Sequence, residues 1–186
     1  MLTITYFVHG TTTDNEHDLA TGWEPGELSE LGIEQSKKLG AIVSDQNFDI
    51  VFCSDLKRAV DSANLAFASK YEIIQDKRLR EANYGDFTET NSETFKNDND
   101  IEKYINNPFP NGESYKDVEK RMVDFLKDIS QKYDGKHIAI VAHQAPQLAL
   151  DVLLGGKTWE QAMREDWRRV KEWKPGWEYT YHNLST

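Results

Sequence analysis

Two histidines in this chain directly follow short apolar runs that are typical of buried strands. His9 comes after residues 3–8, "TITYFV", and His143 comes after residues 137–142, "HIAIVA". The ordinary pKa of an imidazole is about 6.5, so near neutral pH its neutral form can act as a nucleophile or as an acid–base group. Each histidine alone could instead be a structural residue that binds a backbone carbonyl. Only a larger set of matching residues can decide between the two interpretations.

The elements around these histidines predict an α/β fold. The expected strands cover residues 3–8, 48–54, 71–75 and 137–142, and helical spacing predicts helices over 29–43, over 55–69, after 114 and over 146–154. Strands that alternate with helices imply parallel βαβ units. We therefore expect a single domain over residues 1–186, a three-layer α/β/α sandwich with a mostly parallel central sheet. Ligands bind beyond the carboxyl ends of the strands of such a sheet, where both histidines lie.

Local signals set the expected end and face of the first long helix. Ser29 is suited to cap it, and Leu31, Leu39 and Ile42 recur on one face, so we expect these three side chains to be buried.

Two further helices are predicted from capping boxes. One is formed by Ser114 with Asp117 and the other by Thr158 with Gln161. The stretch from residue 76 to about 110 shows no regular pattern.

The composition limits the partners of the chain. It carries 32 acidic and 22 basic residues, a net charge of -10, without a long basic run. Nucleic acids and anionic membranes favour clustered Lys and Arg, so neither is expected as a partner. No apolar stretch is long enough for a signal peptide or a membrane span, and the single cysteine, Cys53, excludes an internal disulfide. These features predict a cytoplasmic protein.

The histidines belong to a series of six motifs. They are the His9-Gly10-x-Thr12 loop, Asn15, "SDLKRA" at 54–59, "LREANYGD" at 79–86, "NGES" at 111–114 and "VAH" at 141–143. Together, and in this order, they resemble the histidine phosphatase superfamily, the phosphoglycerate-mutase-like group with two histidines. The resemblance covers residues 3 to about 155.

The resemblance implies a role for each matching residue. His9 corresponds to the nucleophilic histidine of the family's Arg-His-Gly motif, and His143 to its second histidine. Arg58 corresponds to its second arginine and Glu81 to its acid. The residues that the resemblance assigns to substrate binding are Gly10, Thr12, Asn15 and Gln144. Family members transfer phosphoryl groups through a phosphohistidine and need no metal, so neither a metal site nor a cofactor is expected.

The chemistry of these residues fits that role. A phosphoryl group in transfer spreads charge over its oxygens, so a catalyst must offer an in-line nucleophile and surrounding donors. His9 can supply a neutral imidazole and Arg58 a planar fork of donors, while the helix after His143 can supply unpaired N–H groups. The leaving alkoxide needs a proton, which an acid such as Glu81 can give. A zinc site is not expected, because the chain has one cysteine, no "HExxH" and no close pair of histidines.

One position departs from the family's pattern. The family has an arginine directly before the nucleophile, whereas this chain has Val8. Either Val8 replaces that arginine or one residue has been lost, and a loss would turn His9 to the other face of the strand unless the loop compensates. Because the residues of the following loop stay in step with His9, we expect the histidine to face the pocket, in a site weakened by the missing cation.

The C-terminal stretch after residue 156 lies outside the matched motifs. We expect its tryptophans to pack the tail onto the sheet. Alternatively, one of its arginines reaches the pocket mouth and binds the rest of the substrate. The tryptophans are Trp167, Trp173 and Trp177, and the arginines are Arg164, Arg168 and Arg169.

The leading hypothesis is a metal-independent phosphatase that hydrolyses a phosphate monoester of a small metabolite through a phosphohistidine, with activity reduced by the missing arginine. A phosphoglycerate-mutase-type phosphotransferase is one alternative, although true mutases of the family carry an insertion that closes over the intermediate and for which this chain has no room. A phospho-ligand-binding protein with little or no turnover is another. The expected partner is a small phosphorylated metabolite, and the expected state is a monomer or homodimer.

Overall fold

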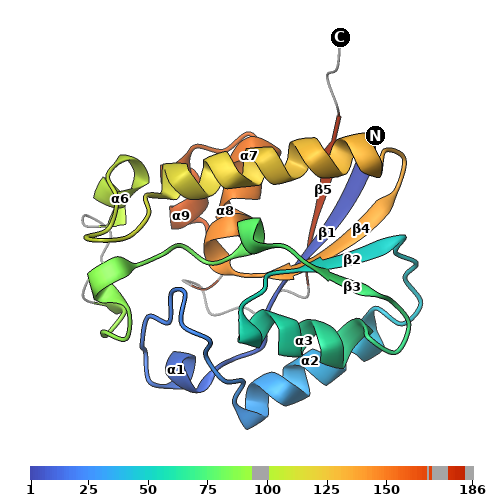
Figure 1. Ribbon diagram of the computed structural model, residues 1–186, viewed down its shortest axis with the longest axis horizontal. Helices are drawn as coiled ribbons and strands as arrows, with labels where there is room; N and C mark the ends of the chain where they lie inside the picture. Colours follow the sequence, from blue (N-terminus) through green and yellow to red (C-terminus); the bar gives the residue numbers. More distant parts are fainter. Residues whose placement is uncertain (94–100, 167, 169–175, 183–186) are drawn as a thin grey trace.

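Five strands of the computed structural model form one twisted sheet with the order β3-β2-β4-β1-β5 (Figure 1). The structure describes residues 1–93, 101–166, 168 and 176–182. The strands are β1 Leu2–Val8, β2 Ile50–Cys53, β3 Ile73–Gln75, β4 His137–Ala142 and β5 Trp177–Tyr181. Neighbouring strands from β3 to β1 run parallel, and β5 alone pairs antiparallel, with β1. The sheet is thus mostly parallel, as predicted.

Helices cover both faces of the sheet (Figure 1). On one side lie α2 Glu30–Ile42 and α3 Lys57–Phe67, and on the other lie α7 Tyr115–Lys132 and α8 Gln144–Leu153. The shorter elements are α1 Thr13–Glu16, η1 Lys77–Leu79, η2 Gly85–Phe87, α6 Lys103–Asn106 and α9 Trp159–Arg164. The prediction of a three-layer α/β/α sandwich is confirmed. None of the helices in the described ranges combines the length and the apolar composition needed to cross a membrane.

The strands are apolar on both faces because a parallel sheet is covered on both sides. In β1, Tyr6 packs into the core beneath α7 and α8, whereas the next residue, Phe7, packs into the core beneath α2 and α3. In β4, every residue after His137 is buried. Burial on both faces fixes the register of these strands, and the register in turn fixes where their carboxyl ends lie.

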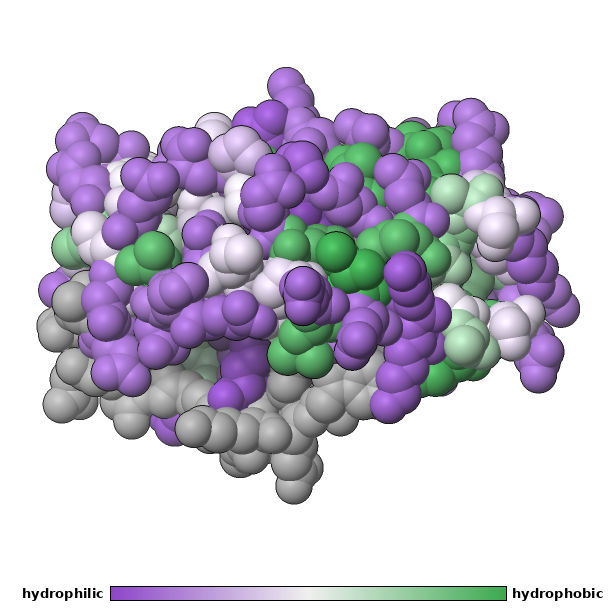
Figure 2. Space-filling view, turned by 90° about the horizontal axis from the view of Figure 1, so that it is seen from below, coloured by the Kyte–Doolittle hydropathy of each residue, from purple (hydrophilic) through white to green (hydrophobic). Residues whose placement is uncertain are grey.

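The predicted helix caps are confirmed, but the predicted face of α2 is wrong. Leu31 and Ile42 are 49% and 43% exposed, and α2 buries small residues instead, Gly32 and Ser36, together with Leu39. Figure 2, which views this side from outside, accordingly shows apolar side chains among mostly hydrophilic ones. Small residues are required because the loop after β1 lies directly against α2.

The C-terminal tail contains a strand, β5, that was not predicted from the sequence. β5 alternates between the core and solvent, since Trp177 and Tyr179 are buried while Glu178 and Thr180 are exposed. The expectation that Trp177 packs the tail onto the sheet is therefore confirmed. Trp167 and Trp173 lie outside the described residues.

We predict that Gly32→Ala destabilises the protein, although alanine inside a helix is ordinarily more stable than glycine by about 1 kcal/mol. A Cβ at Gly32 would lie 1.9 Å from the carbonyl oxygen of Thr11. Either α2 or the loop after His9 must then shift, at a cost of about 1–3 kcal/mol. Urea unfolding measures the change, with Lys37→Ala on the exposed side of α2 as the control. A Gly32→Ala variant as stable as the parent would contradict this close packing.

Candidate active site

The pairing of β1 with β4 places His9 beside His143. Val8 lies opposite Ala142 in the parallel register, and the backbone N–H of His9 donates to the carbonyl of Ala142 at 3.0 Å. The centroids of the two imidazole rings are 5.1 Å apart. Two histidines that are 134 positions apart in the chain thus meet at one edge of the sheet, as the sequence indicated.

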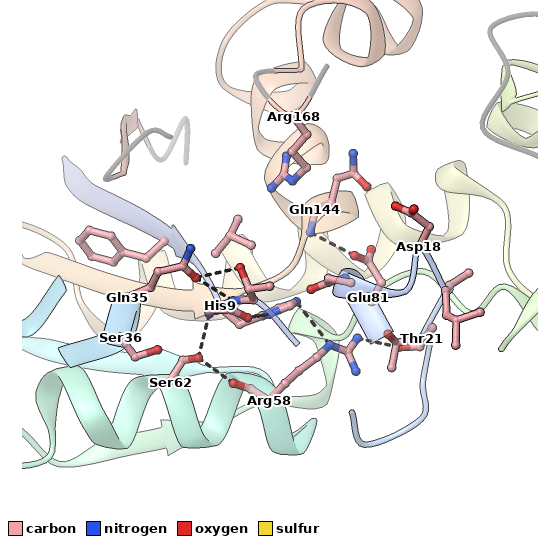
Figure 3. Close-up of a pocket in the computed structure, with 18 of the residues that line it drawn as sticks. His9, Asp18, Thr21, Gln35, Ser36, Arg58, Ser62, Glu81, Gln144 and Arg168 are labelled. Atoms are coloured by element: carbon pink, nitrogen blue, oxygen red, sulfur yellow. Dashed lines mark hydrogen bonds between the residues drawn. The ribbon is translucent and has the colours of Figure 1, made fainter. Parts of the chain in front are cut away.

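A cavity of about 440 Å³ opens at this edge (Figure 3). Six of the predicted site residues line it: His9, Gly10, Asn15, Arg58, Glu81 and Gln144. The position of the cavity and a part of its wall were therefore predictable from the sequence. Two predicted site residues, Thr12 and His143, do not line it.

Hydrogen bonds fix the tautomer of His9. Its Nδ1 lies 2.7 Å from the carbonyl oxygen of Gly10, and because a carbonyl only accepts, Nδ1 carries the proton. Its Nε2 accepts a hydrogen bond of 3.3 Å from Nε of Arg58. The lone pair of His9 therefore lies on Nε2, on the side of Arg58.

His9 is uncharged at neutral pH. Burial, and after it the positive charge of Arg58, lowers the pKa of His9 from 6.5 to about 3, although its hydrogen bond to Gly10 opposes the shift. The ring is only partly exposed, within the cavity wall. A neutral imidazole with its lone pair on Nε2 is the form that can attack phosphorus, once the hydrogen bond from Arg58 is given up.

Arg58 sits at the start of α3, where its side chain is almost completely buried. Its Nη2 donates to the carbonyl of Gly22 at 2.7 Å, and its Nη1 donates to the carbonyls of Glu24 at 2.6 Å and Pro25 at 3.4 Å. Arg58 thus holds the loop before α2 as well as facing His9.

The carboxylate of Glu81 binds the N-terminus of α8. It accepts from the backbone N–H groups of Gln144 at 3.1 Å and Ala145 at 2.9 Å, and also from that of Ala82 at 2.9 Å. The positive end of a helix dipole attracts anions, so Glu81 occupies a position where a phosphate oxygen would also be stabilised.

His143 is completely buried, behind the cavity wall. Among the described residues, neither of its ring nitrogens has a hydrogen-bond partner. Its backbone is fixed by Tyr6, whose hydroxyl donates to the His143 carbonyl at 2.7 Å and accepts from the His143 N–H at 2.9 Å. Burial, followed by the charge of Arg58, lowers the pKa of His143 well below 6.5. Both histidines of the site are therefore neutral.

Thr12 lies in a helix cap instead of on the cavity wall. It is completely buried, and its hydroxyl accepts from the N–H of Asn15 at 3.1 Å, while Oδ1 of Asn15 accepts from the N–H of Thr12 at 3.1 Å. This capping box begins α1. The physical reason for the correction is that the Thr12 hydroxyl already has a partner within the loop, so only Asn15 reaches the cavity.

Several residues of the cavity wall were not predicted from the sequence. Ser62, one turn after Arg58 on α3, accepts from the N–H of Gly10 at 3.0 Å and donates to the carbonyl of Arg58 at 2.8 Å. Ser62 could have been predicted, because its spacing from Arg58 places both side chains on the same face of a helix. Thr11 also lines the cavity and is held by Gln35.

The strand next to His9 is regular. The pairing of β1 with β4 continues through Val8 without a bulge, and Val8 lines the cavity beside His9. Val8 thus stands directly before the nucleophile candidate, where the family has its arginine, and this geometry favours replacement over the loss of a residue.

Of the two candidate arginines in the tail that the structure describes, Arg168 reaches the cavity. Arg168 lines the wall, whereas the side chain of Arg164 is 62% exposed and lies 4.0 Å from Glu102. Arg169 is outside the described residues. Within the described ranges, no group of three or more His, Cys, Asp or Glu side chains is arranged to hold a metal ion.

Comparisons with known proteins agree with this geometry. Residues 6–170 match the model of the histidine phosphatase superfamily (branch 1). The chain is 31% identical over 170 residues to a 2,3-bisphosphoglycerate-dependent phosphoglycerate mutase of Rhizobium meliloti (strain 1021), covering 84% of this chain and 81% of that protein. It is 29% identical over 149 residues to a Bacillus subtilis (strain 168) protein named uncharacterized phosphatase PhoE, covering 80% and 75%. The crystal structure of the alpha-ribazole phosphatase from Shigella flexneri superposes with a TM-score of 0.73 at 26% identity, covering 87% and 84%.

We predict that protonation of His9 and His143 destabilises the protein in mild acid. Their folded pKa values lie below the ordinary 6.5, so the unfolded chain binds protons more readily. This contribution to stability is complete above about pH 6.5 and falls as the pH drops, by up to about 1.4 kcal/mol per pH unit for each histidine. The free energy of unfolding, measured with urea at each pH between 6 and about 4.5, should fall less steeply with decreasing pH in His143→Gln than in the parent, because most carboxylates have not yet titrated in this range. The exposed His17, changed to Gln, is the control; equal slopes in all three proteins would contradict the prediction.

Proposed function

Because the chain belongs to the histidine phosphatase superfamily (branch 1), we propose that it is a phosphatase that hydrolyses a phosphate monoester of a small metabolite through a phosphohistidine on His9. The observation that carries the proposal is the neutral His9, whose Nε2 lone pair lies beside the guanidinium of Arg58.

The first step forms a bond between Nε2 of His9 and phosphorus while the bond from phosphorus to the alcohol oxygen breaks. Arg58 and the N-terminus of α8 stabilise the charge on the phosphoryl oxygens. A phosphate that accepts hydrogen bonds from the N–H groups of Gln144 and Ala145 would displace the carboxyl group of Glu81 from them. The carboxyl group would then lie beside anionic oxygens, which favour its protonated form. Glu81 then gives its proton to the departing alkoxide.

The second step transfers the phosphoryl group from His9 to water. Glu81, now ionised, takes a proton from the attacking water, and the bond between Nε2 and phosphorus breaks to release inorganic phosphate. His9 returns to its neutral form. Val8 adds no cation to either step, so we expect turnover to be lower than with an arginine at that position.

A second cavity favours hydrolysis of a larger monoester over a phosphoglycerate mutase reaction. It has a volume of about 420 Å³ and shares Asp18, Gln144 and Arg168 with the first. Ile101 and Met163 make part of its wall apolar, and Asp18 and Glu93 are acidic. An apolar alcohol fits such a wall, whereas these carboxylates would repel the carboxylate of a phosphoglycerate. The mutase remains the second candidate, since a relative at 31% identity carries that name.

We also propose that the protein acts in the cytoplasm, as a monomer or homodimer, on a small phosphorylated metabolite and not on nucleic acid or membranes. The net charge of -10 supports the part of this proposal that concerns nucleic acids and anionic membranes, which attract clustered basic residues.

The experiment that tests the proposal is a screen of phosphorylated metabolites with detection of inorganic phosphate, performed with excess chelator. Release of phosphate from at least one metabolite supports the phosphatase. Rearrangement of the phosphate within a phosphoglycerate would show a mutase instead. Tight phosphate binding without any turnover would show a phospho-ligand-binding protein.

We predict that a labelled aryl phosphate leaves an acid-labile, base-stable label on the protein after alkaline quenching. The label should form in the presence of excess chelator, because the proposed reaction uses no metal, and it should be absent from His9→Ala. His17→Ala serves as the matched control and should be labelled like the parent. Label that persists in His9→Ala, or that is found on Cys53, would refute the role of His9.

We predict that Glu81→Gln affects poor leaving groups more than good ones. An alkyl alkoxide needs a proton, so kcat/KM for an alkyl phosphate should fall by about 10²- to 10⁴-fold. A nitrophenolate leaves without one, so the loss for nitrophenyl phosphate should be much smaller. Equal losses for both substrates would show that Glu81 acts only by holding α8.

A further inference from the structure

Val8 and Arg58, the positions of the family's two arginines, offer few donors to a phosphate bound at His9. Val8 offers neither a charge nor a side-chain donor. Arg58 directs both of its Nη atoms at backbone carbonyls of residues 22–25 and its Nε at His9. Arginine is suited to phosphate because its fork presents two parallel N–H groups, and in Arg58 this fork is already engaged.

A second guanidinium reaches the same cavity from the C-terminal segment. Arg168 follows α9 and lines the cavity together with Val8, His9 and Glu81. In Figure 3 its side chain points toward His9 from the side opposite to Arg58. Its charge is also a contributor to the lowered pKa of His9, after burial and Arg58, which agrees with this proximity.

The position of Arg168 is fixed by its neighbours. Oδ1 of Asp166 accepts from Nη1 of Arg168 at 2.6 Å and from its backbone N–H at 3.1 Å, and Nε2 of Gln144 donates to the other carboxylate oxygen. The guanidinium carbon lies 5.9 Å from the ring centroid of Trp177 in β5. These contacts connect Arg168 both to the sheet and to the first residue of α8, so little entropy is lost when it binds a ligand.

We infer that Arg168 is a substrate-binding residue, whose guanidinium binds the phosphate group opposite Arg58 and supplies the cation that Val8 does not provide. The hydrolysis that follows binding rests on the proposed function. Binding of the phosphate group by Arg168 does not depend on turnover.

Titration calorimetry with inorganic phosphate tests this inference. A charge-assisted hydrogen bond between arginine and phosphate predicts that Arg168→Gln weakens phosphate binding by about ten- to a hundredfold. Arg168→Lys keeps the charge but loses the two parallel N–H donors, so its phosphate affinity should lie between that of the parent and that of Arg168→Gln. The matched control is Arg164→Gln on α9, because that side chain is exposed and lies outside the cavity; it should bind phosphate like the parent.

A second cation separates phosphate binding from a merely structural role of Arg168. If Arg168 replaces the missing charge, adding Val8→Arg to Arg168→Gln should restore most of the phosphate affinity. The same change in the parent should then give a much smaller gain. A structural defect would not be repaired by a cation from another element, and urea unfolding shows whether each variant is folded.

Three outcomes would overturn the inference. They are equal phosphate affinity in Arg168→Gln and the parent, failure of Val8→Arg to restore binding in a folded double variant, and no binding of millimolar phosphate by the parent. Failure of the proposed function looks different, because phosphate would still bind in an Arg168-dependent way while no phosphate monoester is hydrolysed.

Discussion

The pairing of β1 with β4 is the interaction on which the candidate site depends. It brings His9 and His143 to the same edge of the sheet, and the bond from the His9 N–H to the Ala142 carbonyl fixes where β1 ends. Tyr6 connects the same two strands by binding both backbone groups of His143. A slip of one residue would turn His9 to the opposite face and separate it from Arg58.

Burial gives the site its chemical state. The two imidazoles are surrounded by protein and lie near Arg58, so both are neutral and His9 keeps its lone pair on Nε2. This arrangement opposes stability, because an unpaired buried polar group costs about 1–3 kcal/mol and both ring nitrogens of His143 are unpaired among the described residues. Such local costs are common where residues are selected for function and the surrounding core supplies the stability.

The parts of the structure that follow from local pattern were predictable. The apolar runs before His9 and His143 gave the two central strands, and Ser29 and Ser114 marked true helix starts. The face of α2 was not predictable, because Gly32 is buried through close contact with a loop that is distant in sequence. β5 was missed because "WEYTY" becomes a strand only by pairing with β1.

The same distinction holds within the site. His9, Arg58 and Glu81 were identifiable because each lies in a recognisable motif, whereas the place of Arg168 depends on how Asp166 and Trp177 pack the tail. Thr12 shows the opposite case. It lies in a recognisable motif, but its hydroxyl accepts a hydrogen bond within a helix cap and does not face the cavity. A motif therefore predicts which loop forms the site, but not which of its side chains face the cavity.

Proton and nitrogen correlation spectra of protein labelled with ¹⁵N in its histidine rings test the central claim most directly. We predict that His9 carries its proton on Nδ1 and stays neutral from pH 8 down to about pH 4, because burial and Arg58 lower its pKa to about 3. A His9 signal that titrates near pH 6.5, or that shows the proton on Nε2, would contradict it.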